Sequence, residues 1–171
     1  MKRSPRSYRE PPSEPAHLRV FVYGTLKRGQ ANHERFCRGL LSAREATVQG
    51  RLYDLPFGFP ALVVPGEDVY ATGTTDYLAD AAEQHNTRAK PLAPLPDRDL
   101  VHGELLTFDD PVERLPALDS LEGFRPAENS FYRRILITAV LEKTGEGVLS
   151  WVYAIESPSG VYLPGGRWPT M

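Results

Sequence analysis

Hydrophobic positions along the chain fall mainly into short runs of β-branched and aromatic residues, which is the pattern of largely buried β-strands. The segments with this pattern are 18–23, 46–55, 100–110, 131–142 and 148–155. Helices are predicted over shorter segments, at 32–39, 77–84 and 114–124. Strands therefore outnumber helices, and no strand–helix–strand rhythm repeats along the chain. This pattern predicts an α+β fold, with a curved sheet or small β-barrel flanked by helices.

Two segments differ in composition from the strand-rich parts of the chain. Residues 1–16 are rich in Pro, Ser, Arg and Glu. They can bury too little apolar surface to offset the entropy of ordering, so we expect a flexible N-terminal tail. The remainder, 17–171, has the length of a single domain. Within it, residues 67–100 are polar and then proline-rich. We interpret them as an inserted excursion and a candidate lid over a binding site.

Charge and cysteine content narrow the classes of partner and compartment. The 171 residues carry a formal net charge of −2, which gives no general attraction to nucleic acid or to anionic membranes. No apolar run approaches the roughly 18–20 residues of a membrane span, and the basic N-terminus lacks the apolar core of a secretory signal. The one cysteine, Cys37, excludes an internal disulfide. We expect a cytoplasmic protein without nucleic-acid or membrane partners, in which Cys37 is a buried, unreactive thiol.

Motifs for the common cofactor and metal chemistries are absent from the sequence. It contains no glycine fingerprint for dinucleotides, no phosphate-binding P-loop and no nucleophile elbow of a serine hydrolase. The four histidines lack the spacing of known zinc motifs, so we predict no metal site. Acid–base chemistry by a single side chain remains as a candidate.

Glu122 is the carboxylate whose position in the pattern is unusual. In "LPALDSLEG" it lies four residues after Leu118 and seven after Leu115, which puts it on the apolar face of the predicted helix. Desolvation there would raise its pKa toward neutrality, as a proton-shuttling base requires. The alternative is that Glu122 only forms an ion pair with one of three nearby cations, which are Arg125, Arg133 and Arg134. Asp119, three residues earlier, is expected to face solvent or to cap a neighbouring element.

The segment "VFVYGTLKRGQANH", from Val20 to His33, is an apolar strand that breaks into a glycine-containing turn. Taken alone, the turn is more typical of a structural role than of binding. Together with the later "LDSLEGF" and "FYRR", it resembles the γ-glutamyl cyclotransferase-like family, and within that family the γ-glutamylamine cyclotransferases. "GRLYDLPFGFPALV" and "VHGELLTFDD" are similar to segments in the same order there. The resemblance extends from about Arg19 to Ile155.

The resemblance implies a small mixed β-barrel with flanking helices and a reaction that needs no cofactor. It implies that the turn holds the γ-glutamyl group of a small-molecule substrate through Tyr23, Gly24, Thr25 and Leu26. It also implies that Glu122 is the catalytic acid/base, and that the products are 5-oxoproline and a free amine or amino acid. Tyr132 and Tyr153 lie on predicted strands and are candidates for lining the cavity. The leaving group and the oligomeric state are not specified.

Two other functions are compatible with the same residues. The first is a non-catalytic module that binds a γ-glutamyl ligand or regulates a partner, because a fold does not guarantee an activity. The second is an enzyme of different acyl chemistry that removes a γ-glutamyl cap from a larger metabolite, for which the long segment 67–100 would suit a bulky substrate.

Overall fold

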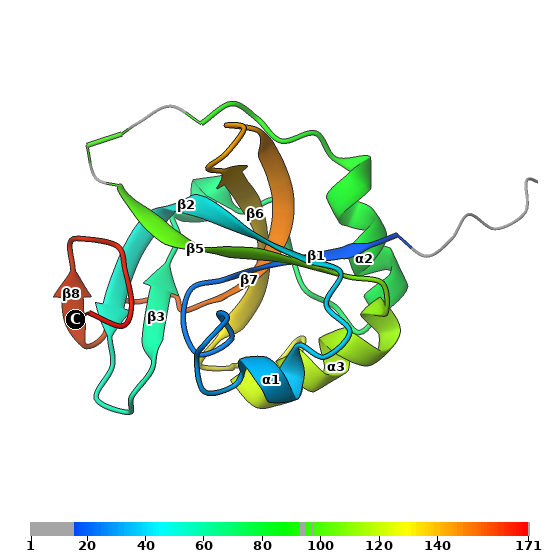
Figure 1. Cartoon of the computed structure of the whole chain (residues 1–171), viewed down its shortest axis with the longest axis horizontal. Coiled ribbons are helices and arrows are strands. Elements are labelled where there is room, and N and C mark those ends of the chain that lie inside the picture. The colour runs from blue at the N-terminus through cyan, green and yellow to red at the C-terminus, as the bar shows by residue number, and fades with distance from the viewer. Residues whose placement is uncertain (1–15, 93–94, 97, 171) are drawn as a thin grey trace, which may run out of the picture.

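A closed barrel of five strands forms the centre of the protein (Figure 1). The structure, a computed structural model, describes residues 16–92, 95–96 and 98–170. The expected tail lies almost entirely outside these residues. In barrel order, the strands are β2 (Ser42–Asp54), β5 (Asp99–Phe108), β1 (Leu18–Val22), β7 (Gly147–Ala154) and β6 (Arg133–Leu141). Pairing of β6 with β2 closes the barrel. The β1–β7 pair is parallel and the other pairs are antiparallel, which confirms the predicted mixed barrel.

Additional elements extend the barrel and cover it. The strands are β3 (Pro60–Val63), β4 (Ala71–Thr72) and β8 (Val161–Leu163). The helices are α1 (His33–Phe36), the 3-10 turn η1 (Gly66–Asp68), α2 (Tyr77–Asn86) and α3 (Pro111–Glu122). Figure 1 shows α2 and α3 together on one side of the barrel and β3 and β8 on the other. Strand β8 pairs with β2 but has only three residues, too few to show a periodic pattern in the sequence.

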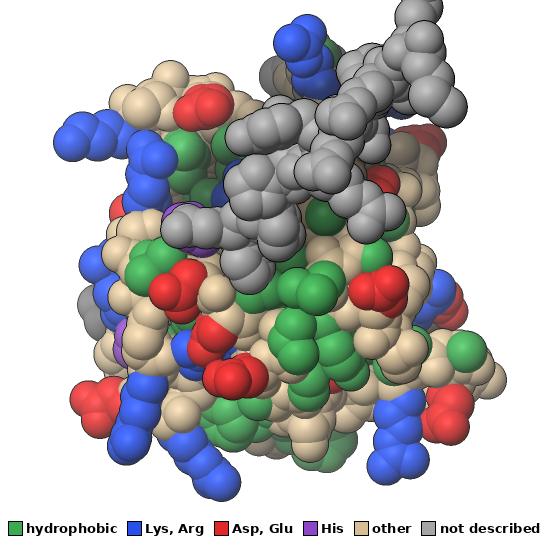
Figure 2. Space-filling view, turned by 90° about the vertical axis from the view of Figure 1, so that its right-hand side faces the viewer, with side chains coloured by type: hydrophobic (Ala, Val, Ile, Leu, Met, Phe, Trp, Pro, Cys, Tyr) green, Lys and Arg blue, Asp and Glu red, His purple; other side chains and the backbone are tan. Residues whose placement is uncertain are grey.

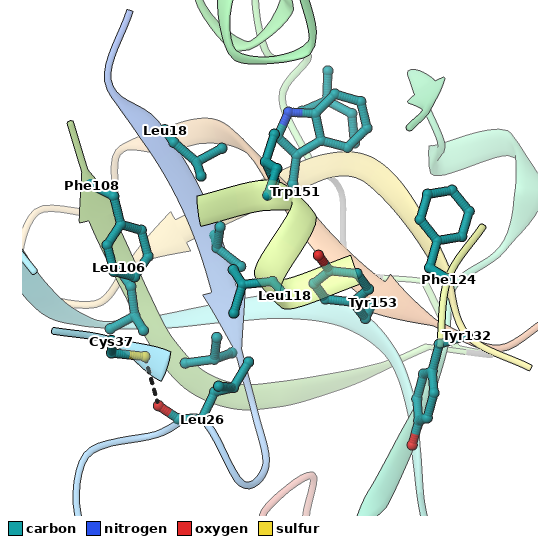
Figure 3. Close-up of a cluster of buried hydrophobic side chains, with 14 of the residues drawn as sticks. Leu18, Leu26, Cys37, Leu106, Phe108, Leu118, Phe124, Tyr132, Trp151 and Tyr153 are labelled. Carbon is teal, nitrogen blue, oxygen red and sulfur yellow. Dashed lines mark hydrogen bonds between the residues drawn. The ribbon is translucent and has the colours of Figure 1, made fainter. Parts of the chain in front are cut away.

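The apolar run of β1 is explained by burial of both its faces. Val20 and Val22 belong to a cluster that also contains Leu118 of α3, so this face of β1 packs under the helices. Phe21 and Tyr23 belong to a second cluster, which is built from strand residues. Because successive side chains of a strand point to opposite faces, one strand contributes to both cores. Figure 3 shows the helix-covered cluster, with Tyr153 beside Leu118 and Tyr132 at the edge.

Helix α2 is packed into the domain, although it lies in the segment interpreted as an inserted excursion. It contacts β7, β1 and α3. The buried Gln84 accepts a hydrogen bond from the backbone N–H of Arg19 at 2.7 Å, and Trp151 of β7 donates to the carbonyl of Asp80 at 2.9 Å. Figure 2, which faces the side of α2 and α3, shows hydrophobic side chains gathered in the middle of this face with acidic ones around them.

Candidate active site

A cavity of about 320 Å³ opens where the turn after β1, the residues before β3, the end of α3 and the start of β6 meet. This volume suits a small ligand. Every residue that the sequence singled out as a site candidate lies in its wall: Tyr23, Gly24, Thr25, Leu26, Glu122, Tyr132 and Tyr153. The structure thus brings the turn and Glu122 to one cavity, although they are far apart in the sequence. None of the described residues from 67–100 lines it, so the interpretation of that segment as a lid gains no support.

The turn after β1 is held by a short network of its own. The N–H of Lys27 donates to the carbonyl of Gly24 at 3.1 Å. The Asn32 side chain donates to the Thr25 hydroxyl at 2.9 Å, and His33 Nδ1 lies 2.8 Å from the carbonyl of Leu26. Asn32 directly precedes α1, but its side chain makes no capping hydrogen bond to the helix. The side chain instead stabilises the turn through Thr25.

The backbone N–H groups of Gly24, Thr25 and Leu26 have no hydrogen-bond acceptor among the described residues. Turns that expose successive N–H groups form concave sites for anions. Gly24 is required for the close packing here, because a Cβ on it would lie 2.8 Å from the ring of Pro60. The turn therefore offers donors for a carboxylate or an oxyanion at the floor of the cavity.

Three tyrosines form a fixed wall around the cavity. Tyr23 donates its hydroxyl hydrogen to the carbonyl of Tyr153, and Tyr132 donates to the carbonyl of Pro60, each at 2.6 Å. Tyr153 donates to Asp119 Oδ1, also at 2.6 Å. Burial raises the pKa of all three phenols, so they stay neutral. Because each hydroxyl hydrogen already has a protein acceptor, the tyrosines shape the cavity and leave the carboxylate of Glu122 without a donor.

Glu122 projects from the last turn of α3, which ends at Gly123 in the left-handed conformation with φ 70°. No hydrogen bond or ion pair joins the Glu122 carboxylate to another described residue. Desolvation by the cavity wall raises its pKa from an ordinary 4.5 to about 7. The three arginines considered as partners bind other carboxylates: Arg125 binds Glu128, Arg133 binds Glu156, and Arg134 binds Asp119 and Asp80. The structure therefore does not support the ion-pair alternative for Glu122.

Asp119 is buried, and the expectation that it faces solvent or caps a neighbour is wrong. Its carboxylate accepts hydrogen bonds from Arg134 at 2.8 and 3.2 Å and from Tyr153 at 2.6 Å. Arg134 is fully buried and also donates to Asp80 of α2 at 3.0 Å. The sequence could not reveal this network because its members come from α2, α3, β6 and β7, which meet only in the folded chain. It anchors the helix that carries Glu122.

The cations after the turn, Lys27 and Arg28, are not part of the cavity wall. Lys27 donates from Nζ to the carbonyl of Trp168, and Arg28 forms an ion pair with Glu104 at 2.7 Å.

Cys37 is buried as expected, and burial raises the pKa of its thiol to about 11. Among the residues that the structure covers, no three His, Cys, Asp or Glu side chains are grouped to hold a metal ion. No described helix is both long and apolar enough to cross a bilayer.

A known protein family matches most of this chain. The sequence model of the family described as "Gamma-glutamyl cyclotransferase, AIG2-like" matches residues 20–86 and 83–170. The chain belongs to this family. A curated relative from Niallia circulans, named γ-L-glutamyl-butirosin B γ-glutamyl cyclotransferase, is 38% identical over 48 residues. That match spans 28% of this chain and 31% of the relative.

Solved structures of the same fold are more distant in sequence. An AIG2-like protein from Mus musculus is 24% identical with a TM-score of 0.52, and the match covers 84% of this chain and 80% of that one. YkqA from Bacillus subtilis is 16% identical with a TM-score of 0.53, and the match covers 89% of this chain and 39% of that one. These likenesses support the fold.

Other residues of the cavity wall were not identified from the sequence as site residues. They include Asn32, Phe59, Pro60, Leu121 and Phe131. The strand pattern assigns most such aromatic and apolar residues to packing, and only their tertiary placement distinguishes a cavity wall from a core. The adjacent aromatic pair Phe131–Tyr132 directly before a strand was the one available signal.

Proposed function

We propose that this protein is a γ-glutamyl cyclotransferase that converts a γ-glutamyl amine or amino acid into 5-oxoproline and the free amine. The observation that carries the proposal is the position of Glu122. Its carboxylate has no protein partner among the described residues and has a pKa of about 7. It lies in the wall of the same cavity as Gly24, Thr25 and Leu26, whose N–H groups have no acceptor among the described residues. A carboxylate with such a pKa can both accept and return a proton near neutral pH.

The reaction assigns one proton carrier to both chemical steps. Glu122 accepts a proton from the α-ammonium group of the substrate, and the resulting amine attacks the γ-amide carbonyl carbon. The attacking nitrogen then carries one excess proton. As the old C–N bond breaks, Glu122 returns the first proton to the leaving nitrogen, and this second proton passes to the same nitrogen. The products are the lactam 5-oxoproline and an ammonium, so protons balance without a second catalytic acid. A proton shuttle of this kind needs no cofactor.

Binding by the turn supplies the other part of the proposed catalysis. The N–H groups of Gly24, Thr25 and Leu26 are suited to hold the α-carboxylate of the substrate or the oxyanion that forms on its γ-carbonyl. Holding the glutamyl chain in a bent conformation replaces a random encounter of its two ends with a favourable geometry. The rigid wall of Tyr23 and Tyr153 supports that conformation. The name of the curated relative from Niallia circulans, which describes a γ-glutamyl cyclotransferase, supports the same reaction type.

The test is product formation from three substrates. Purified protein is incubated with γ-glutamyl-ε-lysine, γ-glutamyl-alanine and glutathione, and 5-oxoproline is measured. We expect product from at least one substrate, and a loss of about a hundredfold or more in kcat for Glu122→Gln. The matched control is Glu113→Gln, the same substitution at an exposed position in the first turn of α3, which should retain activity.

The alternatives predict different results in this assay. Binding of a γ-glutamyl ligand without any 5-oxoproline would favour the non-catalytic module. Release of free glutamate in place of 5-oxoproline would favour a hydrolytic enzyme that removes a γ-glutamyl cap. Equal activity of wild type and Glu122→Gln would exclude the role assigned to Glu122.

A further inference from the structure

The turn at 24–26 is held at both ends by one residue of the neighbouring strand, Glu104 of β5. Strands β1 and β5 lie side by side and antiparallel (Figure 1), and Val22 at the end of β1 is the pairing partner of Glu104. After the turn, the backbone N–H of Arg28 donates to Oε1 of Glu104 at 2.7 Å. Glu104 therefore binds the chain before the turn with its backbone and after the turn with its side chain.

The Glu104 side chain is buried, although carboxylates are rarely buried without a partner. It is 8% exposed. Oε1 accepts the N–H of Arg28 and Oε2 accepts the Nε of the same residue, each at 2.7 Å. Charge-assisted hydrogen bonds of this length are stronger than bonds between neutral groups. The cost of burying the charge is therefore offset by two bonds to the segment that follows the turn.

A second carboxylate next to Glu104 provides a comparison within the same protein. Glu45 of β2 is the pairing partner of Glu104 on the other side of β5. It approaches the same guanidinium, that of Arg28, at 3.6 Å, but its side chain is 60% exposed. Of these two carboxylates, Glu104 is the one that also accepts the backbone N–H of Arg28. The two residues thus share an ion-pair partner and differ in their contact with the backbone.

Gly103 allows β5 to approach the end of β1 closely. A Cβ at residue 103 would lie 2.2 Å from the carbonyl oxygen of Val22 and 2.7 Å from the ring of Phe21. A residue with a side chain would therefore push the two strands apart at the point where the turn begins. The close approach keeps the next residue, Glu104, within hydrogen-bond distance of Arg28.

The N–H groups that we propose as donors to the substrate lie between these two points of attachment. Inside the turn, the N–H of Lys27 donates to the carbonyl of Gly24 at 3.1 Å. That bond determines the shape of the turn, whereas the position of the turn relative to the barrel depends on bonds to the strands. Position is important because a displacement of about 1 Å can greatly reduce what a binding group contributes.

We propose that Glu104 is a positioning residue, which holds the N–H of Arg28 and thereby fixes the turn at 24–26 for binding of a γ-glutamyl group. Glu104 is not part of the cavity wall, so it acts through the turn and does not touch the substrate. This inference rests on the proposed function and adds to it a residue outside the cavity that determines how tightly the turn binds.

Two substitutions separate the geometry of the acceptor from its charge. Glu104→Gln keeps the length of the side chain and an oxygen that can accept the N–H of Arg28, but it removes the charge. Glu104→Asp keeps the charge but is shorter by one methylene, so its carboxylate cannot reach both donors. We expect Glu104→Gln to bind within about threefold of its parent and Glu104→Asp to bind about tenfold more weakly. The matched control is Glu45→Asp, which should bind as tightly as the parent.

The affinity is measured by calorimetry with γ-glutamyl-methylamide, in proteins that all carry Glu122→Gln so that turnover is removed. This parent and the three variants derived from it are compared. Equal affinities of the parent and Glu104→Asp would overturn the inference. A larger loss in Glu104→Gln than in Glu104→Asp would also overturn it, because the charge would then be more important than the acceptor.

The same measurements distinguish this inference from the proposed function. The expected order of affinities, combined with no 5-oxoproline from the wild-type protein, would support the role of Glu104 and contradict the proposed reaction. Formation of 5-oxoproline with equal affinities in all variants would do the reverse. Failure of γ-glutamyl-methylamide to bind any of the proteins would overturn both.

Hydrogen exchange of the backbone amides, followed by NMR, tests the attachment without any ligand. The Arg28 amide should be protected in the wild type, because a buried carboxylate accepts its hydrogen. Glu104→Asp should accelerate exchange at the amides of Lys27 and Arg28 about tenfold or more, whereas Glu104→Gln and Glu45→Asp should leave it nearly unchanged. A lower free energy of unfolding in Glu104→Asp without faster exchange at these two amides would assign Glu104 to the fold alone and overturn the inference.

Discussion

Replacing Glu122 by Gln should make the protein more stable as well as less active, and the gain in stability should depend on pH. The folded-state pKa of about 7 lies above the ordinary 4.5 because burial disfavours the charged carboxylate. Between these values the unfolded chain loses the proton while the folded protein keeps it, so the free energy of unfolding falls as pH rises. Above about pH 7 both states are ionised and the full cost is present.

The size of the effect follows from the two pKa values. A difference of about 2.5, at about 1.36 kcal/mol for each pKa unit, corresponds to about 3 kcal/mol. Gln is uncharged at every pH and has nearly the same shape. We therefore expect Glu122→Gln to exceed wild type in the free energy of unfolding by about 3 kcal/mol at pH 8. At pH 4.5 and below the two proteins should differ little, because the folded wild type is then protonated.

Urea unfolding followed by circular dichroism at several pH values measures this difference directly. Glu113→Gln is the control, because it removes the same charge from an exposed position on the same helix. A difference between wild type and Glu122→Gln that is the same at pH 4.5 and pH 8 would refute the claim that desolvation raises the pKa of Glu122. In the catalytic assay, kcat/KM of wild type should rise with pH and level off above about pH 7, because the base form must accept the first proton.

Two further substitutions test the turn and the buried network. Gly24→Ala should weaken binding of γ-glutamyl ligands about tenfold, because its Cβ would lie 2.8 Å from the ring of Pro60. Calorimetry measures the affinity, and the control is Gly66→Ala, where the space around the added Cβ is open. Equal affinities of wild type and Gly24→Ala would contradict the role of the turn. Arg134→Met should lower the free energy of unfolding by about 3–5 kcal/mol, because two buried aspartates lose their partner. Arg133→Met, at a more exposed ion pair, should cost about 1 kcal/mol or less, and similar losses in both would count against the network.

The main features of the fold could be predicted because they depend on local pattern. The runs at 18–23 and 131–142 are apolar over the length of a strand, and the structure has β1 and β6 there. Helix α3 lies largely within the predicted segment 114–124 and ends at Glu122, because Gly123 adopts the left-handed conformation that a residue without a Cβ reaches with little strain. Strand β8 was missed because three residues carry no period. The prediction of a mixed barrel came from the family resemblance, since strand pairing joins distant segments.

The sequence by itself determined the longer strands and helices, the family and the candidates on the turn and at Glu122, because hydrophobic period, turn chemistry and motif order are properties of neighbouring residues. Only the tertiary structure decided that Glu122 lacks a partner while Asp119 is paired with Arg134. The two carboxylates are three residues apart on one helix, and their surroundings come from strands elsewhere in the chain. Burial, pairing and pKa depend on what lies within a few ångströms in space, and the order of residues does not specify those distances.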